Sequence, residues 1–246
     1  MGGALLLSPV ILELGIIPLP AVAIPEEDVI EKLSAIPVYT IVGDEGQPLF
    51  GSFNDVDSSS IPAFIDQENA DTFVERDELF PDDNNPRVIP VPLGQLYEFQ
   101  QTQGSDPENQ NAAFTLGMVP DTEQVTQAIS LLQEQGEEVE EFRGVPVFIT
   151  ILEVEGQEVY LALERADRRG VLVFFDYQDF ENLVQNLTAN AEEPKPKISA
   201  QVASLELMID ILLARDDAWL LEVEFVPTPE SRQFIQQLRE QQSQDQ

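Results

Sequence analysis

Carboxylates are the reactive side chains that this sequence offers in quantity. The chain has 46 aspartates and glutamates and 12 lysines and arginines, but neither histidine nor cysteine. Without imidazole and thiol groups it has no Cys-His or Ser-His nucleophile, no thiolate zinc site and no disulfide. Its net charge of -34 would repel phosphate backbones and anionic lipid, so we expect no nucleic-acid partner.

The carboxylates show no spacing that predicts catalysis. A glycosidase needs one acid buried beside apolar side chains and a second roughly 5 to 10 Å away, and no pattern here points to such a pair. The acidic clusters Asp82-Asp83, Asp216-Asp217 and 137–141 lack the D-x-D-x-D-G spacing of a calcium loop. We therefore expect no catalytic residue, no metal site and no cofactor. A hydrolase that uses carboxylates is kept as a remote alternative to the two non-enzymatic functions given below.

The remaining charged groups have structural interpretations. Asp66 and Asp176 each follow a strand pattern and precede a helical one, so we interpret both as N-caps. The basic cluster of Arg165, Arg168 and Arg169 could recognise a carboxylate of a partner. Pairing with the neighbouring acids of the same loop is the favoured interpretation.

These charged positions lie within a pattern of strands and helices that occurs twice. In the second half we predict a strand, a Glu155-Gly156 turn, a return strand, a buried strand and a helix that begins after Asp176. The same order recurs in the first half, at an offset of 110 for Ile61–Asp66 against Val171–Asp176 and of 107 for Phe114–Pro120 against Leu221–Pro227. Matches in the same order at nearly constant offset indicate an internal duplication.

The predicted fold class is α/β (α+β), with two pseudo-twofold related copies of one unit. Each copy is expected to contain a hairpin, a strand, a helix, a strand, a short helix, a strand and a helix, and the first hairpin is expected over Ile36–Phe53. The predicted boundaries are a leader at 1–23, the first repeat at 24–137, the second repeat at 138–240 and a flexible tail at 241–246.

The leader is predicted to be the remains of a secretory signal. Ala4–Ala23 is almost wholly apolar and ends in Ala21-Val22-Ala23, the small-x-small pattern that signal peptidase recognises. No basic residue precedes the apolar run, and Glu13 interrupts it. Glu13 and several prolines make it a poor spanning helix, so we expect an exported protein that is peripheral to the membrane.

A series of short motifs resembles the Tic22 family. The resemblance covers about residues 26 to 238 and depends on the order of the motifs, since each alone is only an apolar segment, in most cases with a proline. The motifs are Lys32-Leu33, Ile36-Pro37-Val38-Tyr39-Thr40-Ile41, Gly46-Gln47-Pro48-Leu49, Val91-Pro92-Leu93-Gly94-Gln95-Leu96-Tyr97, Gly144-Val145-Pro146-Val147-Phe148 and Val173-Phe174-Phe175.

This resemblance implies a soluble, non-enzymatic component of protein translocation. It implies a pseudo-twofold α/β body with apolar grooves that hold unfolded or extended polypeptide. It further implies location in the plastid intermembrane space or, for cyanobacterial relatives, in the periplasm or thylakoid lumen, with a link to outer-membrane biogenesis. A membrane translocation or outer-membrane assembly machine is an implied partner.

A helix that is apolar on two sides is the candidate for polypeptide binding. Its core stripe is expected to consist of Leu205, Met208, Ile209 and Leu212. Leu207 and Ile211 lie on the other side, where they are either sandwiched within the protein or exposed as a contact surface.

The short helix of the first half offers Leu96, Tyr97 and Phe99, with Tyr97 expected in the place of Glu206. The predicted polypeptide-binding residues are therefore Leu96, Tyr97, Phe99, Leu207 and Ile211.

Two functions follow from these expectations. The first is an ATP-independent chaperone that assists translocation or outer-membrane protein biogenesis. The alternative is a periplasmic adaptor that docks on a membrane assembly machine without holding unfolded clients. Suppression of the aggregation of an unrelated unfolding protein would distinguish them, because only the chaperone should show it.

Overall fold

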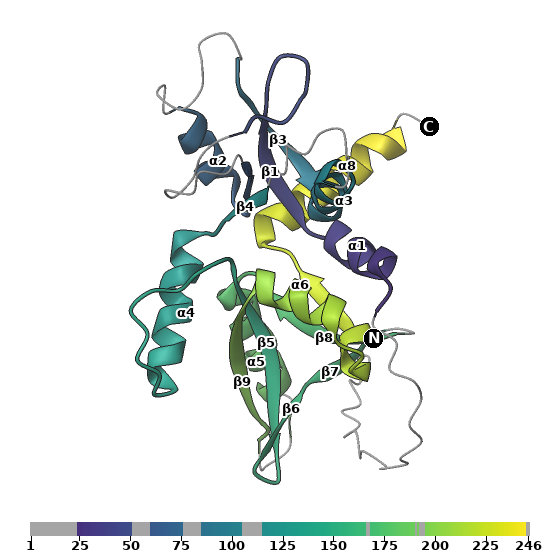
Figure 1. The fold of residues 1–246 in the computed structure, drawn as a ribbon. Helices are drawn as coiled ribbons and strands as arrows, with labels where there is room; N and C mark the ends of the chain where they lie inside the picture. Colours follow the sequence, from purple (N-terminus) through teal and green to yellow (C-terminus); the bar gives the residue numbers. More distant parts are fainter. Residues whose placement is uncertain are drawn as a thin grey trace.

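The computed structural model describes residues 24–50, 60–75, 85–104, 115–165, 168–189, 191 and 195–244 (Figure 1). The leader at 1–23 lies outside these residues. Helices and strands are mixed along the described part, which fits the predicted α/β (α+β) class. The elements are α1 (Glu26–Ser34), β1 (Pro37–Val42), β2 (Ser60–Phe64), α2 (Gln67–Val74), β3 (Arg87–Pro92), α3 (Leu93–Gly104), β4 (Thr115–Val119), α4 (Thr122–Glu134), β5 (Pro146–Val154), β6 (Gln157–Tyr160), β7 (Ala162–Arg165), β8 (Arg168–Phe174), α5 (Tyr177–Ala189), β9 (Lys197–Ser204), α6 (Leu205–Ala214), α7 (Ala218–Leu221), β10 (Val223–Val226) and α8 (Pro229–Gln244).

The described strands form two mixed sheets with corresponding order. The first sheet has the order β3-β1-β2-β4, and the second contains β9, β5, β8 and β10 in the same sequence of neighbours. The pairs β2–β4 and β8–β10 are parallel. The pairs β3–β1, β1–β2, β9–β5 and β5–β8 are antiparallel. The second sheet is larger because β6 also pairs with β5, and β7 also pairs with β8.

Individual contacts recur at corresponding places in the two halves. Tyr39 is opposite Phe64 in the first sheet, as Phe148 is opposite Phe174 in the second. Asp66 accepts the Asn69 N–H at 2.8 Å, and Asp176 accepts the Asp179 N–H at the same distance, which confirms both as N-caps. These contacts agree with the duplicated sequence pattern. The pseudo-twofold relation and the boundaries at 24–137 and 138–240 remain predictions.

The hairpin of the second half is confirmed, and the described part of the first-half hairpin also shows antiparallel pairing. β5 and β6 are joined by Glu155 and Gly156, both at positive φ (53° and 80°), as a two-residue hairpin of right-handed twist requires. In the first half the described return segment pairs with β1 through a bridge between Val42 and Pro48. The Gly43 N–H donates to the Gln47 carbonyl at 3.0 Å, and the Leu49 N–H donates to the Ile41 carbonyl at 2.8 Å. The rest of that predicted hairpin, 51–53, lies outside the described residues.

One core is shared by the two halves. Every residue of β1 is buried, as are the first six of β5, because each strand has both faces covered. One face of each sheet contributes to the same apolar cluster, together with α1, α3 and α6. Figure 1 shows α1 between the upper and the lower part of the molecule. The first of the described helices therefore packs into both halves.

Two further cores lie on the opposite faces of the sheets. Phe148, Leu172 and Phe174 pack with side chains of α4 and α5 on the second sheet. Tyr39, Ile41 and Phe64 pack with α2 on the first sheet. Each sheet thus lies between two layers of helix, as an α/β sheet requires when both of its faces are apolar.

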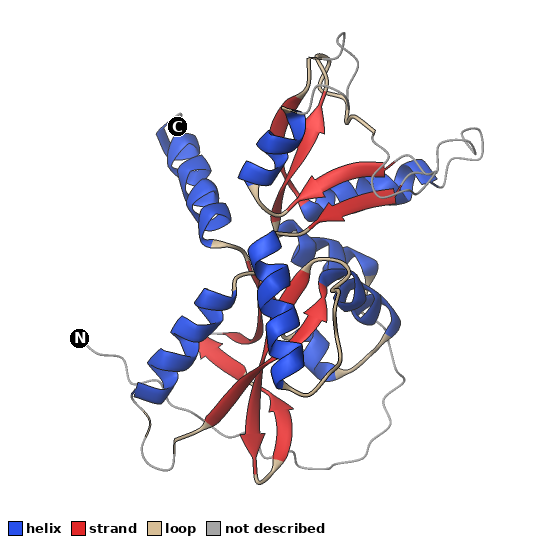
Figure 2. Cartoon of the chain, turned by 90° about the vertical axis from the view of Figure 1, so that its left-hand side faces the viewer, coloured by secondary structure: helices blue, strands red, loops and turns tan. Residues whose placement is uncertain are grey.

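The last helix of each half packs on the sheet of the other half. α4 follows β4 of the first sheet, yet its Ala128 and Leu131 lie in the core of the second, and Gln135 Nε2 donates to the Ala200 carbonyl of β9 at 3.1 Å. α8 follows β10 of the second sheet but contacts β1. Figure 2 shows α8 reaching from the lower part toward the upper one. This exchange ties the halves together.

The C-terminal segment is helical further than expected. α8 continues as far as Gln244, into the segment 241–246 that the sequence predicts to be a flexible tail. Glutamine has good helix propensity, which favours continuation of the helix there.

Candidate functional site

The α6 helix is anchored at its first residues. The Leu205 N–H donates to the Val145 carbonyl at 2.8 Å, and Ser204 caps the helix by accepting the Leu207 N–H at 3.1 Å. Leu205, Met208 and Leu212 are at most 1% exposed, which confirms three of the four residues of the predicted core stripe. Ile209, the fourth, is half-buried against the same core.

Glu206 fixes the orientation of α6 against β5. Its carboxylate accepts the Val145 N–H, with distances of 3.3 and 3.2 Å to Oε1 and Oε2. Burial raises the pKa of Glu206 above its ordinary value, while the hydrogen bonds from backbone N–H groups and from Ser204 act in the opposite direction. A partly desolvated carboxylate therefore holds the start of the helix in place.

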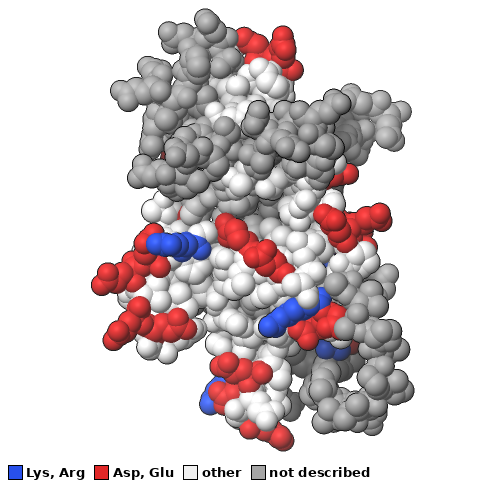
Figure 3. Space-filling model, in the orientation of Figure 1, with Lys and Arg blue, Asp and Glu red and all other residues white. Residues whose placement is uncertain are grey.

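The side of α6 outside the core stripe carries two apolar side chains that differ in exposure. Leu207 is 51% exposed, and Ile211 is half-buried against the shared core. Figure 3 shows large uncharged areas in the middle of this face of the molecule, between scattered acidic side chains. This α6 strip, Leu207 and Ile211, is therefore accessible to a partner mainly through Leu207.

The predicted residues on α3 lie mainly in the core. Leu96 is 6% exposed, whereas Tyr97 and Phe99 are half-buried. α1 packs against both α3 and α6, so the two predicted sets of residues are on different helices with α1 beside both. Their use in polypeptide binding stays a prediction.

The expected match of Tyr97 with Glu206 is wrong. Leu93 N–H donates to the Ile36 carbonyl at 2.8 Å, just as Leu205 N–H donates to that of Val145. Leu93 therefore corresponds to Leu205, and Tyr97 corresponds to Ile209. The stretch of chain that precedes α6 is longer than the stretch that precedes α3. A constant sequence offset between the two halves therefore aligns the wrong residues of these helices.

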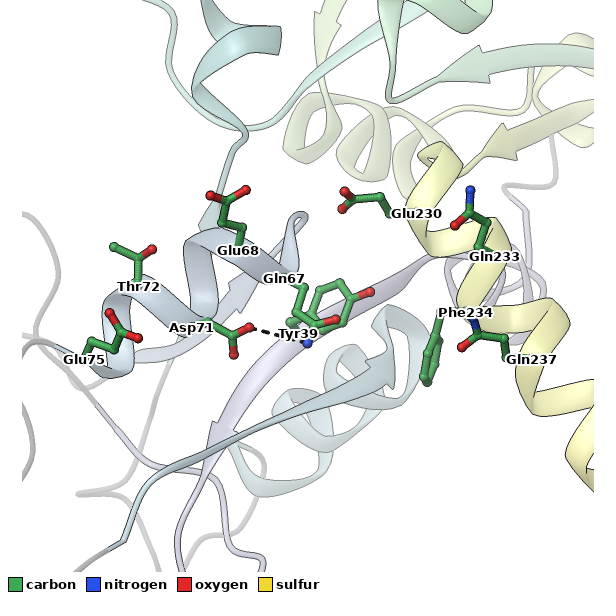
Figure 4. Close-up of a pocket in the computed structure, with 10 residues that line it drawn as sticks. All are labelled: Tyr39, Gln67, Glu68, Asp71, Thr72, Glu75, Glu230, Gln233, Phe234 and Gln237. Carbon is green, nitrogen blue, oxygen red and sulfur yellow. Dashed lines mark hydrogen bonds between the residues drawn. The ribbon is translucent and has the colours of Figure 1, made fainter.

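Two grooves that the sequence did not reveal lie on the outer faces of the sheets. A pocket of about 570 Å³ lies between α2 and α8, over Tyr39 of β1 (Figure 4). A pocket of about 440 Å³ lies between α4 and α5, beside β9. Both pockets have one wall from the exchanged helix, α8 or α4. The sequence could not show them because helical periodicity does not specify which sheet a helix covers.

The groove between α2 and α8 is mainly polar. In Figure 4 the Tyr39 ring and the Phe234 ring lie toward the space between the helices, while carboxylates and amides line its sides. Burial raises the pKa of the Tyr39 phenol, and the negative charges of Glu230, Asp66 and Asp71 raise it further. This groove therefore suits polar or cationic groups better than apolar ones.

The groove between α4 and α5 is the more apolar of the two. Tyr177 stacks on Phe180 with ring centroids 5.4 Å apart and meets the edge of Phe148 at 5.2 Å. The apolar lining consists of Leu131, Tyr177, Phe180, Val184, Ile198 and Ala200. Aromatic side chains in such an arrangement offer a surface for apolar side chains of a partner.

The described residues show neither a metal cluster nor a spanning helix. Within them, no three carboxylates are arranged to hold a metal ion. The same residues include no helix both long and apolar enough to cross a membrane.

Comparison with known proteins gives the family of the chain. The model of the Tic22-like family matches residues 14–237. The chain belongs to the Tic22-like family. This result confirms the resemblance seen in the ordered motifs. No curated protein sequence matches the chain.

Two solved structures of Tic22 proteins share the fold. One, described as Anabaena Tic22 (protein transport), is 24% identical, with a TM-score of 0.69 over 86% of this chain and 96% of that one. The other, Tic22 from Plasmodium falciparum, is 16% identical, with a TM-score of 0.58 over 86% of this chain and 97% of that one. The Tic22-like fold therefore accounts for nearly the whole length of both structures.

Proposed function

We propose that this Tic22-like chain is a non-catalytic protein of the protein-transport machinery that holds extended polypeptide without ATP. The family and the transport role of the Anabaena relative support the general class of function. The observation that supports polypeptide binding is the composition of α6. Leu205, Met208 and Leu212 already fill the core, yet Leu207 on the same helix is half exposed.

Two binding surfaces would lie on opposite faces of the second sheet: the α6 strip on one face and the apolar groove between α4 and α5 on the other. Extended, unfolded segments present alternating apolar side chains, which such a strip and groove can bury. Tyr97 and Phe99 of α3 would contribute from the first half, where they remain half-buried. Leu96 would support this surface without touching the polypeptide, because it lies in the core.

Replacing Leu207 and Ile211 by serine tests this surface. We expect the double variant to lose the suppression of aggregation of an unrelated, heat-unfolding enzyme at near-stoichiometric ratio, because the apolar contact is gone. Its melting temperature should fall by no more than about 5 °C, since Leu207 is exposed and Ile211 only half-buried. Light scattering and circular dichroism measure the two quantities.

The matched control is Val159→Thr, which removes an exposed apolar group elsewhere, on β6, where Val159 is 43% exposed. It should retain full activity. A double variant that melts many degrees lower would instead assign Leu207 and Ile211 to the core. A wild-type chain that suppresses no aggregation would favour the adaptor that docks on a membrane machine.

We further propose that the chain acts after export, in the periplasm or thylakoid lumen, with plastid relatives in the intermembrane space. The Ala21-Val22-Ala23 motif supports this location. Protein isolated from its source should then begin at Ile24, as Edman sequencing or intact-mass measurement would show. A cytosolic protein that retains Met1 would contradict export.

A further inference from the structure

The outer edge of β10 carries backbone groups that face away from the sheet. Among the described strands, β10 pairs only with β8. Val171 N–H donates to the Glu222 carbonyl at 2.8 Å, and Phe175 N–H donates to that of Val226 at 3.2 Å. Because the direction of these groups alternates along a strand, the N–H and C=O of Val223 and Phe225 point away from β8. An edge of this kind is a template for another strand.

Lys32 of α1 covers part of this edge. Its ammonium donates to the carbonyls of Leu221 and Val223, at 3.0 and 2.9 Å. Burial lowers the pKa of Lys32, against the opposing effect of Asp28, Glu31 and Glu224. Lysine at a sheet edge is one of the devices by which proteins prevent unwanted strand pairing. Here one flexible side chain does so, and a rotation of that side chain would uncover both carbonyls.

A groove of about 540 Å³ follows this edge between α1 and β10. Four carboxylates and two cations line it: Asp28, Glu31, Glu222 and Glu224, with Lys32 and Arg169. Arg169 Nε lies 3.1 Å from Oε2 of Glu222, the residue directly before β10. The groove is therefore negative overall, and Leu221, 61% exposed, adds an apolar contact at one end.

We propose that the free edge of β10 binds a basic, extended segment of another polypeptide as an added strand, and that Lys32 occupies the edge until that segment displaces it. The backbone groups that face away from β8 select an extended chain once Lys32 is displaced, and the carboxylates select lysine or arginine in it. This proposal takes from the proposed function only the class of partner, since β10 and the α6 strip are separate surfaces.

Other occupants fit the groove less well. A second copy of this chain would bring the same carboxylates against each other, which costs energy. The chain's own leader contains Glu13 and no lysine or arginine, so it offers no charge complementary to the groove. A basic segment from a different protein is the occupant that the charges favour.

A pair of N-methylated peptides tests strand addition. The probe is a fluorescent ten-residue peptide of alternating lysine and valine, blocked at both ends, in ~0.15 M salt so that long-range attraction is screened. One variant carries N-methyl groups on the lysines and the other on the valines. Because an added strand uses alternate N–H groups, only one variant should lose affinity, by about tenfold or more. Equal losses for both variants would overturn the proposal.

Lys32→Met tests the displacement step on the full chain. The variant should bind the unmodified peptide several-fold more tightly, because the Leu221 and Val223 carbonyls are released. Lys197→Met is the matched control, since it removes the same charge from β9, where Lys197 pairs with Glu153 at 3.0 Å. Equal affinities of the two variants would refute the role of Lys32.

Hydrogen exchange locates the peptide. Bound peptide should slow exchange of the Phe225 amide in wild type, and unchanged exchange there would place the peptide elsewhere. The Leu207→Ser and Ile211→Ser double variant should still bind this peptide. If only one N-methylated peptide loses affinity but the chain suppresses no aggregation, the proposed function is refuted and strand addition stands. If the chain suppresses aggregation but both N-methylated peptides lose affinity equally, strand addition is refuted and the proposed function stands.

Discussion

Leu33→Ala should lower the free energy of unfolding by about 2 to 5 kcal/mol and the melting temperature by about 5 to 15 °C. Leu33 is fully buried, and its neighbours in the shared core come from both sheets. Truncation to alanine removes apolar contacts and leaves a cavity that the surrounding helices can fill only in part. The effect is large because α1 is the element that both halves use.

The single tryptophan shows whether the halves unfold together. Trp219 lies in the second half, stacked on Tyr160 with ring centroids 4.0 Å apart, whereas Leu33 belongs by sequence to the first. In Leu33→Ala the fluorescence transition of Trp219 should shift as far as the circular dichroism transition of the whole chain. A fluorescence midpoint that stays at the wild-type value would mean that the halves unfold independently. Glu27→Ala, at an exposed position of α1, should change stability by no more than about 0.5 kcal/mol.

Local features of the fold could be predicted from the sequence. The Glu155-Gly156 turn followed from a residue pair flanked by alternating apolar positions. Asp66 and Asp176 were found as N-caps because capping depends on a few neighbouring residues. The core stripe of α6 followed from its period. In each case the deciding interaction lies within a few residues along the chain.

Features that depend on distant segments could not be predicted in this way. The spacing of Ala128 and Leu131 predicts an amphipathic helix equally well whether that helix covers its own sheet or the other one. Similarly, the charge of Arg169 is apparent, but its partner Glu222 reaches it only through the parallel pairing of β8 with β10. The grooves, the shared core and the covered edge of β10 all depend on this kind of long-range packing.

The candidate binding site likewise combines a local feature that the sequence predicts with a long-range feature that it does not. Leu207 was expected on a side of α6 that the core stripe does not use, and helical period alone places it there. Whether that side is exposed depends on what packs over it, and Leu207 is half exposed while Ile211 is half-buried. Leu96 has a similar apolar character but lies in the core, because α1 packs against α3.

Gly94 lies where α3 packs closely against α1. A Cβ at Gly94 would lie well inside van der Waals contact with the Ser34 hydroxyl and the Ile30 carbonyl, and 2.9 Å from the Ser34 N. Two of these three atoms belong to the backbone of α1, which cannot move aside as a side chain can. At the corresponding position of α6 the chain carries Glu206, whose side chain binds Val145 N–H instead. Glycine in α3 is therefore explained by the presence of α1.

Gly94→Ala should destabilise the protein by about 1 to 3 kcal/mol, because α1 must shift away from the core that it shares with both sheets. Intrinsic helix propensity predicts the opposite sign, since alanine favours a helix over glycine by about 1 kcal/mol. Urea unfolding of the variant therefore decides between close packing and propensity. Gln95→Ala, at the exposed neighbouring position of α3, should change stability by no more than about 0.5 kcal/mol.

A double variant identifies the atoms responsible. Ser34→Ala removes the hydroxyl that donates to the Ile30 carbonyl at 2.8 Å, but it leaves the α1 backbone in place. Combined with Gly94→Ala it should recover only part of the lost stability, because the Ile30 carbonyl still occupies the space that the new methyl group needs. Full recovery would assign the clash to the hydroxyl alone. A Gly94→Ala protein more stable than wild type would show that α1 does not pack against α3 at this distance, and the shared core would then lose its central helix.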